Sequence, residues 1–143
     1  MKKKAVISIS SKQDDDDPVE VVTPGNFYKR NDKYYAVYKE TEISGMKGTT
    51  TTLKISPEKF SLIRMGTTQT KMDFYKKDDR SLSLYDTPYG TLELEIKTNK
   101  LKVDMQDNGG EVFIDYNLSI VGQKPQNTVL KINIKVDQNK AMF

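Results

Sequence analysis

Three residue types that carry much of protein chemistry are absent from this chain, which contains no cysteine, no histidine and no tryptophan. Without cysteine, the polypeptide cannot form a disulfide bond, a thiolate metal site or a thiol nucleophile. Without histidine, it has no Ser–His or Cys–His catalytic pair, no imidazole base and no imidazole metal ligand. We therefore expect neither an enzyme nor a protein with a metal site or another cofactor.

An excess of charge of one sign is also lacking. The 23 basic and 20 acidic residues give a net charge of +3, so the isoelectric point near 8.9 reflects mixed charge and not a dense cationic surface. Nucleic acid is not an expected partner, because its binding requires clustered positive charge.

Long apolar runs are missing too. Lys2 to Lys4 resemble the charged start of a signal peptide, but the apolar run that follows them breaks at Ser8. No stretch approaches the length of a membrane span. We expect a cytoplasmic protein without membrane contact. Its 143 residues fit a single domain, residues 1–143, in which 1–4 and 138–143 form tails.

Alternation of apolar and polar residues with a period of two is the main signal that is present. Four regular apolar stripes are Leu92, Leu94 and Ile96; Leu101, Val103 and Met105; Val112, Ile114, Tyr116, Leu118 and Ile120; and Leu130, Ile132, Ile134 and Val136. One apolar face and one polar face are typical of a half-buried strand. Shorter segments in the first half repeat the pattern, so we expect an all-β domain of about ten strands.

Turn signals separate these segments at short intervals. Examples are Pro24-Gly25-Asn26, Thr98-Asn99-Lys100 and Asn108-Gly109-Gly110. No link is long enough to hold a crossover helix, which predicts an antiparallel, meandering sheet. Closure into a barrel is favoured because an open sheet would leave long unpaired edges. Residues 57–65 fit a turn followed by a strand, which we favour, or a short helix capped by Ser56.

Several blocks occur in a characteristic order along the chain. They are Tyr38-Lys39-Glu40-Thr41-Glu42, residues 48–55, Leu62-Ile63-Arg64-Met65-Gly66, Met72-Asp73-Phe74, residues 85–92 and residues 113–118. In order and spacing this set resembles the YwiB-like family of uncharacterised bacterial proteins, over almost the whole chain. The resemblance implies a calycin-like barrel similar to the lipocalins. It implies no activity and provides no catalytic residues.

Arg64 is the most informative charged residue. If residues 57–65 include a strand, its side chain shares the inward face with Phe60 and Leu62. A charge inside a small barrel is unfavourable unless it is paired. One hypothesis is therefore a structural ion pair of Arg64 with Glu40 or Glu42.

The other hypothesis is a ligand site. Arg64 would bind the carboxylate of a small molecule inside the barrel, with the hydroxyl groups of Tyr38 and Tyr116 as further donors. The candidate ligand-binding residues are Arg64, Glu40, Tyr38 and Tyr116, and we assign no catalytic or metal-binding residues.

Two other clusters have simpler interpretations. The acidic run Asp14 to Asp17 lacks the spaced ligands and the glycine of a calcium loop, so we expect a solvated connection between strands. A group of aromatic and basic residues would suit single-stranded nucleic acid, although tyrosine and lysine are also ordinary strand residues. This group consists of Tyr28, Lys29, Arg30, Lys33, Tyr34 and Tyr35.

Three functional classes remain at this point. The favoured one is a non-enzymatic barrel that binds a small apolar or amphipathic molecule. The alternative is a structural or protein-interaction module, with residues 28–38 as its contact face and a barrel filled by its own side chains. The candidates for that filling are Phe60, Met72, Phe74 and Tyr116. The third class is an unrecognised enzyme. Interior volume separates the first two, and the oligomeric state, monomer or homodimer, stays open.

Overall fold

All regular secondary structure in the described part of the chain is β-strand. The computed structural model describes residues 2–41, 46–67, 69–77, 80–120 and 123–137. Ten strands lie within these ranges: β1 (Lys3–Gln13), β2 (Val19–Arg30), β3 (Lys33–Lys39), β4 (Thr50–Ile55), β5 (Lys59–Met65), β6 (Gln69–Tyr75), β7 (Arg80–Thr87), β8 (Gly90–Gln106), β9 (Gly109–Ile120) and β10 (Gln126–Val136).

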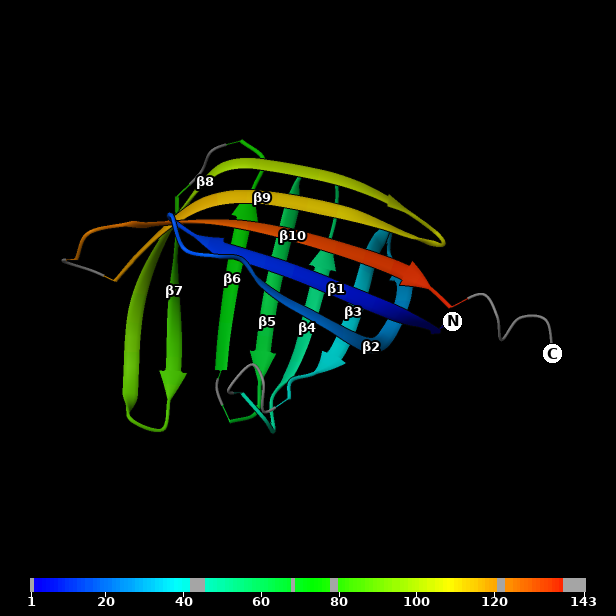
Figure 1. Cartoon of the computed structure of the whole chain (residues 1–143), viewed down its shortest axis with the longest axis horizontal. Coiled ribbons are helices and arrows are strands. Elements are labelled where there is room, and N and C mark those ends of the chain that lie inside the picture. The colour runs from blue at the N-terminus through cyan, green and yellow to red at the C-terminus, as the bar shows by residue number, and fades with distance from the viewer. Residues whose placement is uncertain (1, 42–45, 68, 78–79, 121–122, 138–143) are drawn as a thin grey trace.

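The strands form one closed antiparallel barrel. Each strand pairs with its neighbour in sequence, and β1 pairs with β10 to close the ring. Figure 1 shows β1, β9, β10 and the second half of β8 crossing in front of β3 to β6, while β7 and the first half of β8 extend to one side as a hairpin. The predicted all-β meandering barrel of about ten strands is confirmed.

Local sequence explains most of the strand boundaries. Ser56 closes a tight turn, because its backbone N–H and its hydroxyl both donate to the carbonyl of Lys59 at 2.9 Å. Strand β5 begins at that residue, so the expected turn and strand over residues 57–65 are confirmed and the short helix is not formed. Lys3 and Lys4, which the sequence analysis assigned to a tail, belong to β1.

One predicted turn, Pro24-Gly25-Asn26, is wrong, since all three residues lie inside β2. Proline is tolerated there because the pairing of β2 with β3 begins only at Asn26, which leaves one side of Pro24 without a ladder partner. Gly25 is required for close packing, because a Cβ atom at this position would lie 2.6 Å from the carbonyl oxygen of Val37. Both residues therefore mark a crowded strand and not a reversal of the chain.

A second predicted turn, Thr98-Asn99-Lys100, is wrong for a different reason. The chain continues through it as the 17-residue strand β8, with a register shift against β9 between Thr98 and Lys100. Such a bulge inserts one residue and bends the strand. The inserted Asn99 is held by its amide, which donates to Asp115 at 3.2 Å. The bend lets β8 belong to both the side hairpin and the barrel wall.

The barrel is filled at one end only. Its largest fully buried side chains include Phe27, Phe60, Phe74, Ile7, Ile55 and Ile96. Phe60 and Phe74 pack with their ring centroids 5.9 Å apart, and Phe27 stacks on Tyr34 at 5.4 Å. The other end, where the β1–β2 and β3–β4 connections lie, is hollow and contains the site described next.

The seam between β6 and β7 is the weakest in the barrel wall. Among the described residues, two pairs join the strands there, Gln69 with Asp86 and Thr70 with Tyr85. Beyond them, serine side chains on β7 replace the backbone ladder: Ser81 donates to the carbonyl of Asp73 at 2.9 Å, and Ser83 donates to that of Lys71. Closure of the barrel therefore depends partly on two hydroxyl groups.

Candidate functional site

The open end of the barrel contains a cavity of about 480 Å³. Its polar lining includes all four candidate residues named from the sequence, Tyr38, Glu40, Arg64 and Tyr116. They come from β3, the residue that follows β3, β5 and β9. The strand alternation predicted their inward orientation, and the barrel register brings them to one end.

The rest of the inner wall is mostly apolar. It is formed by Ile9, Val19, Val21, Met46, Leu53, Leu62, Met72, Leu130 and Ile132. Leu53 and Ile132 are almost completely buried. Leu62, Met72 and Leu130 are 6 to 7% exposed and face the hollow. A concave space with mostly apolar walls and a few polar groups is the usual form of a small-molecule site.

Arg64 and Glu40 form the charged pair of this cavity. The Nε atom of Arg64 lies 3.9 Å from Oε2 of Glu40, which is an ion pair but too long for a hydrogen bond. The Glu40 side chain is 4% exposed and that of Arg64 is 22% exposed. Nε of Arg64 is buried and has no hydrogen-bond partner among the described residues. The alternative partner Glu42 lies outside the described residues.

Thr51 holds the same carboxylate oxygen of Glu40 that faces Arg64. The Thr51 hydroxyl donates to Oε2 of the carboxylate, and the backbone N–H of Glu40 donates to the carbonyl of Thr49 at 2.9 Å. Burial raises the pKa of Tyr38, and the neighbouring charge of Glu40 raises it further. Thr51 was missed in the sequence analysis because a threonine run is ordinary strand composition. The structure shows that its inward hydroxyl fixes the carboxylate.

Tyr116 faces the same space from the opposite wall. Its ring packs on Phe74 with the ring centroids 4.7 Å apart, so the aromatic side chains of the filled end hold the Tyr116 ring in place. Burial raises the pKa of Tyr116, while the Thr128 hydroxyl and the positive charge of Arg64 act in the opposite direction. Its hydroxyl therefore stays protonated and available as a donor near neutral pH.

The rim of the cavity carries acidic residues that the sequence analysis assigned only to a solvated connection. Asp16 and Asp17 line the opening, and both are exposed. Asp14 has a structural role, since its carboxylate accepts a hydrogen bond from the backbone N–H of Asn127 at 3.1 Å. No group of three or more acidic side chains placed to hold a metal ion occurs among the residues that the structure covers.

Comparison with known proteins gives the chain a family. A family profile described as "Domain of unknown function (DUF1934)" matches residues 5–132. The chain belongs to this family. A curated relative, "Uncharacterized beta-barrel protein YwiB" of Bacillus subtilis (strain 168), is 26% identical over 126 residues, covering 84% of this chain and 86% of the relative. The resemblance to the YwiB-like family is thereby confirmed.

A solved structure supports the DUF1934 fold. The crystal structure of the YwiB protein from Bacillus subtilis superposes with a TM-score of 0.84 at 22% identity, covering 95% of this chain and 93% of that one. The similarity concerns the barrel itself. The described residues of this DUF1934 member include no helix long and apolar enough to cross a membrane.

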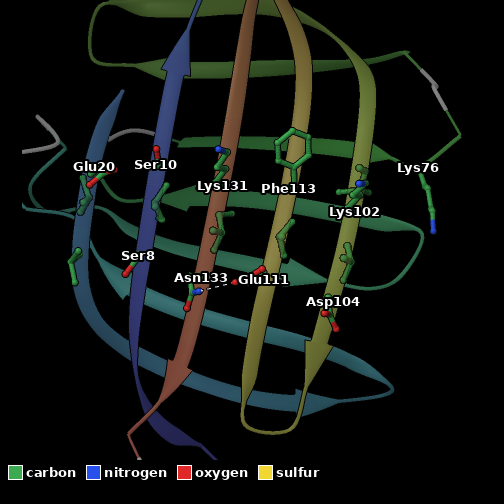
Figure 2. A pocket seen from close by; sticks show the side chains of 17 residues that line it. Ser8, Ser10, Glu20, Lys76, Lys102, Asp104, Glu111, Phe113, Lys131 and Asn133 are labelled. Atoms are coloured by element: carbon green, nitrogen blue, oxygen red, sulfur yellow. Dashed lines mark hydrogen bonds between the residues drawn. The ribbon is translucent and has the colours of Figure 1, made fainter. Parts of the chain in front are cut away.

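The DUF1934 barrel also has a hollow on its outer wall. Figure 2 shows this groove over β2, β1, β10, β9 and β8, and its volume is about 760 Å³. Phe113, the apolar exception on a polar face, lies there between Lys131 and Lys102 in the strand register. The groove lies on the outer wall, and the charged side chains exposed along it include Lys102, Lys131, Asp104 and Glu111. We consider the cavity inside the barrel the better candidate site, because it brings the Arg64–Glu40 ion pair together with two buried tyrosines.

The group of aromatic and basic residues does not form a single surface in this DUF1934 member. Tyr28 and Tyr35 stack on the outer wall with ring centroids 5.0 Å apart. Tyr34 points to the other face, stacks on Phe27 and donates a hydrogen bond from its hydroxyl to Asp107 at 2.8 Å. The sequence cluster is therefore divided between the wall and the closed end of the barrel.

Proposed function

We propose that this DUF1934 protein is a non-enzymatic binding protein that holds one small apolar or amphipathic molecule in the open end of its barrel. The observation that supports this function is the cavity of about 480 Å³, which combines apolar walls with one cluster of polar groups. Pockets of roughly 300–1,000 Å³ are usual for small ligands, and closed antiparallel barrels such as the lipocalins hold one such molecule. The cytoplasm is the proposed location.

Native mass spectrometry of gently purified protein tests this proposal. We expect an additional mass on the native protein that disappears when the same sample is denatured. Leu62→Phe places a larger side chain in the cavity wall and should abolish the additional mass. Leu84→Phe adds the same volume on the outside, where Leu84 is 62% exposed, and should leave the mass unchanged. An additional mass that persists in Leu62→Phe would place the ligand elsewhere.

A second candidate function is a protein-interaction module. Its support is the apolar outer face of the side hairpin, on which Leu82 and Leu84 are 67% and 62% exposed. Exposed apolar patches on soluble proteins often mark contact sites. Sedimentation velocity of the wild type and of Leu82→Ser/Leu84→Ser tests whether this face joins two copies. A wild-type monomer at high concentration would argue against self-association.

A further inference from the structure

The guanidinium group of Arg64 is an underused donor within the cavity. A guanidinium has five N–H groups, but the contact described for Arg64 is the ion pair with Glu40 at 3.9 Å. Its Nε is buried and has no hydrogen-bond partner among the residues described. The Arg64 side chain is 22% exposed and lines the cavity. The polar group at the cavity wall is therefore a planar cation whose Nε has no acceptor among the described residues.

Glu40, in contrast, has little capacity left for a ligand. Its side chain is only 4% exposed, and its Oε2 atom already accepts a hydrogen bond from Thr51. Its negative charge acts on the Tyr38 hydroxyl and on the Arg64 guanidinium. A cationic head group that paired with Glu40 would have to displace these groups, whereas an anionic head group needs only to approach Arg64.

A second donor faces the same space. Tyr116 lines the cavity, and its hydroxyl, which contacts Thr128, lies near enough to Arg64 for the guanidinium charge to act on it. An arginine fork with a neighbouring hydroxyl matches the two oxygens of a carboxylate. The described lining contains one cation, Arg64, against the carboxylates of Asp16, Asp17 and Glu40. Asp16 and Asp17 are exposed at the rim, so Arg64 is the cation beside the apolar interior, and a second negative charge on a ligand would find no cationic partner in the described lining.

The apolar walls and the volume set the rest of the ligand. Leu62, Met72 and Leu130 face the hollow beside the polar cluster. At about 30 Å³ for each water-sized group, 480 Å³ corresponds to on the order of sixteen non-hydrogen atoms. A monocarboxylic acid with an apolar body of about eight to twelve carbons fits this space.

We propose that the cavity binds an apolar monocarboxylic acid, with the carboxylate held by Arg64 and Tyr116 and the apolar body against Leu62, Met72 and Leu130. Glu40 is a positioning residue, fixed by Thr51, that orients the guanidinium from behind. This inference rests on the proposed binding function and names its ligand class.

Isothermal titration calorimetry with three probes of equal chain length tests the proposal. Octanoate, octanol and octylamine differ only in the head group. We expect octanoate to bind about ten- to hundredfold more tightly than octanol, because a hydrogen bond to a charged group contributes that much. Octylamine should bind more weakly still. Within the acids, each added methylene should tighten binding about fourfold until the cavity is full.

Variants assign the carboxylate to Arg64. Arg64→Met should lower octanoate affinity about ten- to hundredfold and leave octanol affinity unchanged. Arg64→Lys keeps the charge but loses the forked guanidinium, so its octanoate affinity should lie between those of wild type and Arg64→Met. Because Arg64→Met leaves Glu40 without its ion pair, Arg64→Met/Glu40→Gln is the second variant, and circular dichroism checks its fold. Arg80→Met, which breaks the exposed pair with Glu95 at 2.6 Å, is the matched control and should bind like wild type.

Different results would contradict the binding function and the ligand class. If none of the three probes binds wild-type protein, both the binding function and the ligand class are wrong. If octanol or octylamine binds as tightly as octanoate, the cavity binds amphiphiles but the carboxylate assignment is wrong. The same conclusion follows if Arg64→Met/Glu40→Gln folds and keeps full octanoate affinity.

Discussion

The Oε2 atom of Glu40 is shared by two partners: it lies 3.9 Å from Nε of Arg64 and accepts a hydrogen bond from the Thr51 hydroxyl. Three adjacent parts of the barrel meet at this atom, the end of β3, strand β4 and strand β5. Thr51 and Arg64 are direct partners in the register of β4 and β5, which explains why both reach one carboxylate.

Coupling between Thr51 and Glu40 is the first prediction. Thr51→Val removes the donor to a buried carboxylate and should lower the free energy of unfolding by about 1–3 kcal/mol. In a Glu40→Gln background the loss should be smaller, because the acceptor is neutral. Urea unfolding of the four proteins measures the coupling, and Thr52→Val on the outer face is the control. Strict additivity of the two changes would contradict the coupling.

Alkaline pH should destabilise the barrel through its buried tyrosines. Burial raises the pKa of both Tyr38 and Tyr116 in the folded protein. Their contribution to stability is fully present below the unfolded pKa of about 10 and is lost as the pH rises toward the folded value. The free energy of unfolding should therefore fall above pH of about 10. Tyr38→Phe/Tyr116→Phe should flatten this fall, and an unchanged slope would contradict it.

The seam between β6 and β7 should open before the rest of the wall. Ser83→Ala removes the hydroxyl that donates to the carbonyl of Lys71, with an expected loss of about 0.5–1.5 kcal/mol. Ser10→Ala on β1, which is paired on both sides, is the control and should change stability less. Hydrogen exchange should be faster for β6 amides than for β10 amides. Equal protection of the two strands would contradict a weak seam.

Two glycines, Gly109 after the β8–β9 turn and Gly90 after the β7–β8 turn, separate backbone strain from steric collision. Gly109 has φ of +119°, and a Cβ atom there would lie 2.1 Å from the carbonyl oxygen of Ile134. Gly90 has a similar φ of +134° with no atom within 4 Å of such a Cβ. Gly90→Ala should therefore lose only about 1–3 kcal/mol from backbone strain, whereas Gly109→Ala should lose clearly more. Thermal unfolding compares them, and equal losses would contradict the collision.

The candidate site was predictable where it depends on strand parity. Phe60, Leu62 and Arg64 alternate within one segment, so the inward direction of the guanidinium follows from a period of two. Asp16 and Asp17 were interpreted only as loop residues, because their place at the rim depends on where the β1–β2 connection lies in the closed barrel. Thr51 was passed over because a threonine run is ordinary strand composition, and only the folded barrel places its hydroxyl on Glu40, a residue outside its own strand.

The sequence by itself determined the class of the fold and much of the excluded chemistry. Alternation and short links are local properties, and they suffice for antiparallel strands with one apolar face; the missing cysteine and histidine exclude thiol and imidazole chemistry outright. Only the tertiary structure decided that Pro24 lies inside a strand, that β8 bends at Asn99, and that aromatic rings fill one end while the other stays hollow. The physical reason is that these features depend on the register between paired strands and on closure of the barrel, neither of which a local pattern specifies. Parity sends a side chain inward, but pairing decides the depth at which it meets its neighbours.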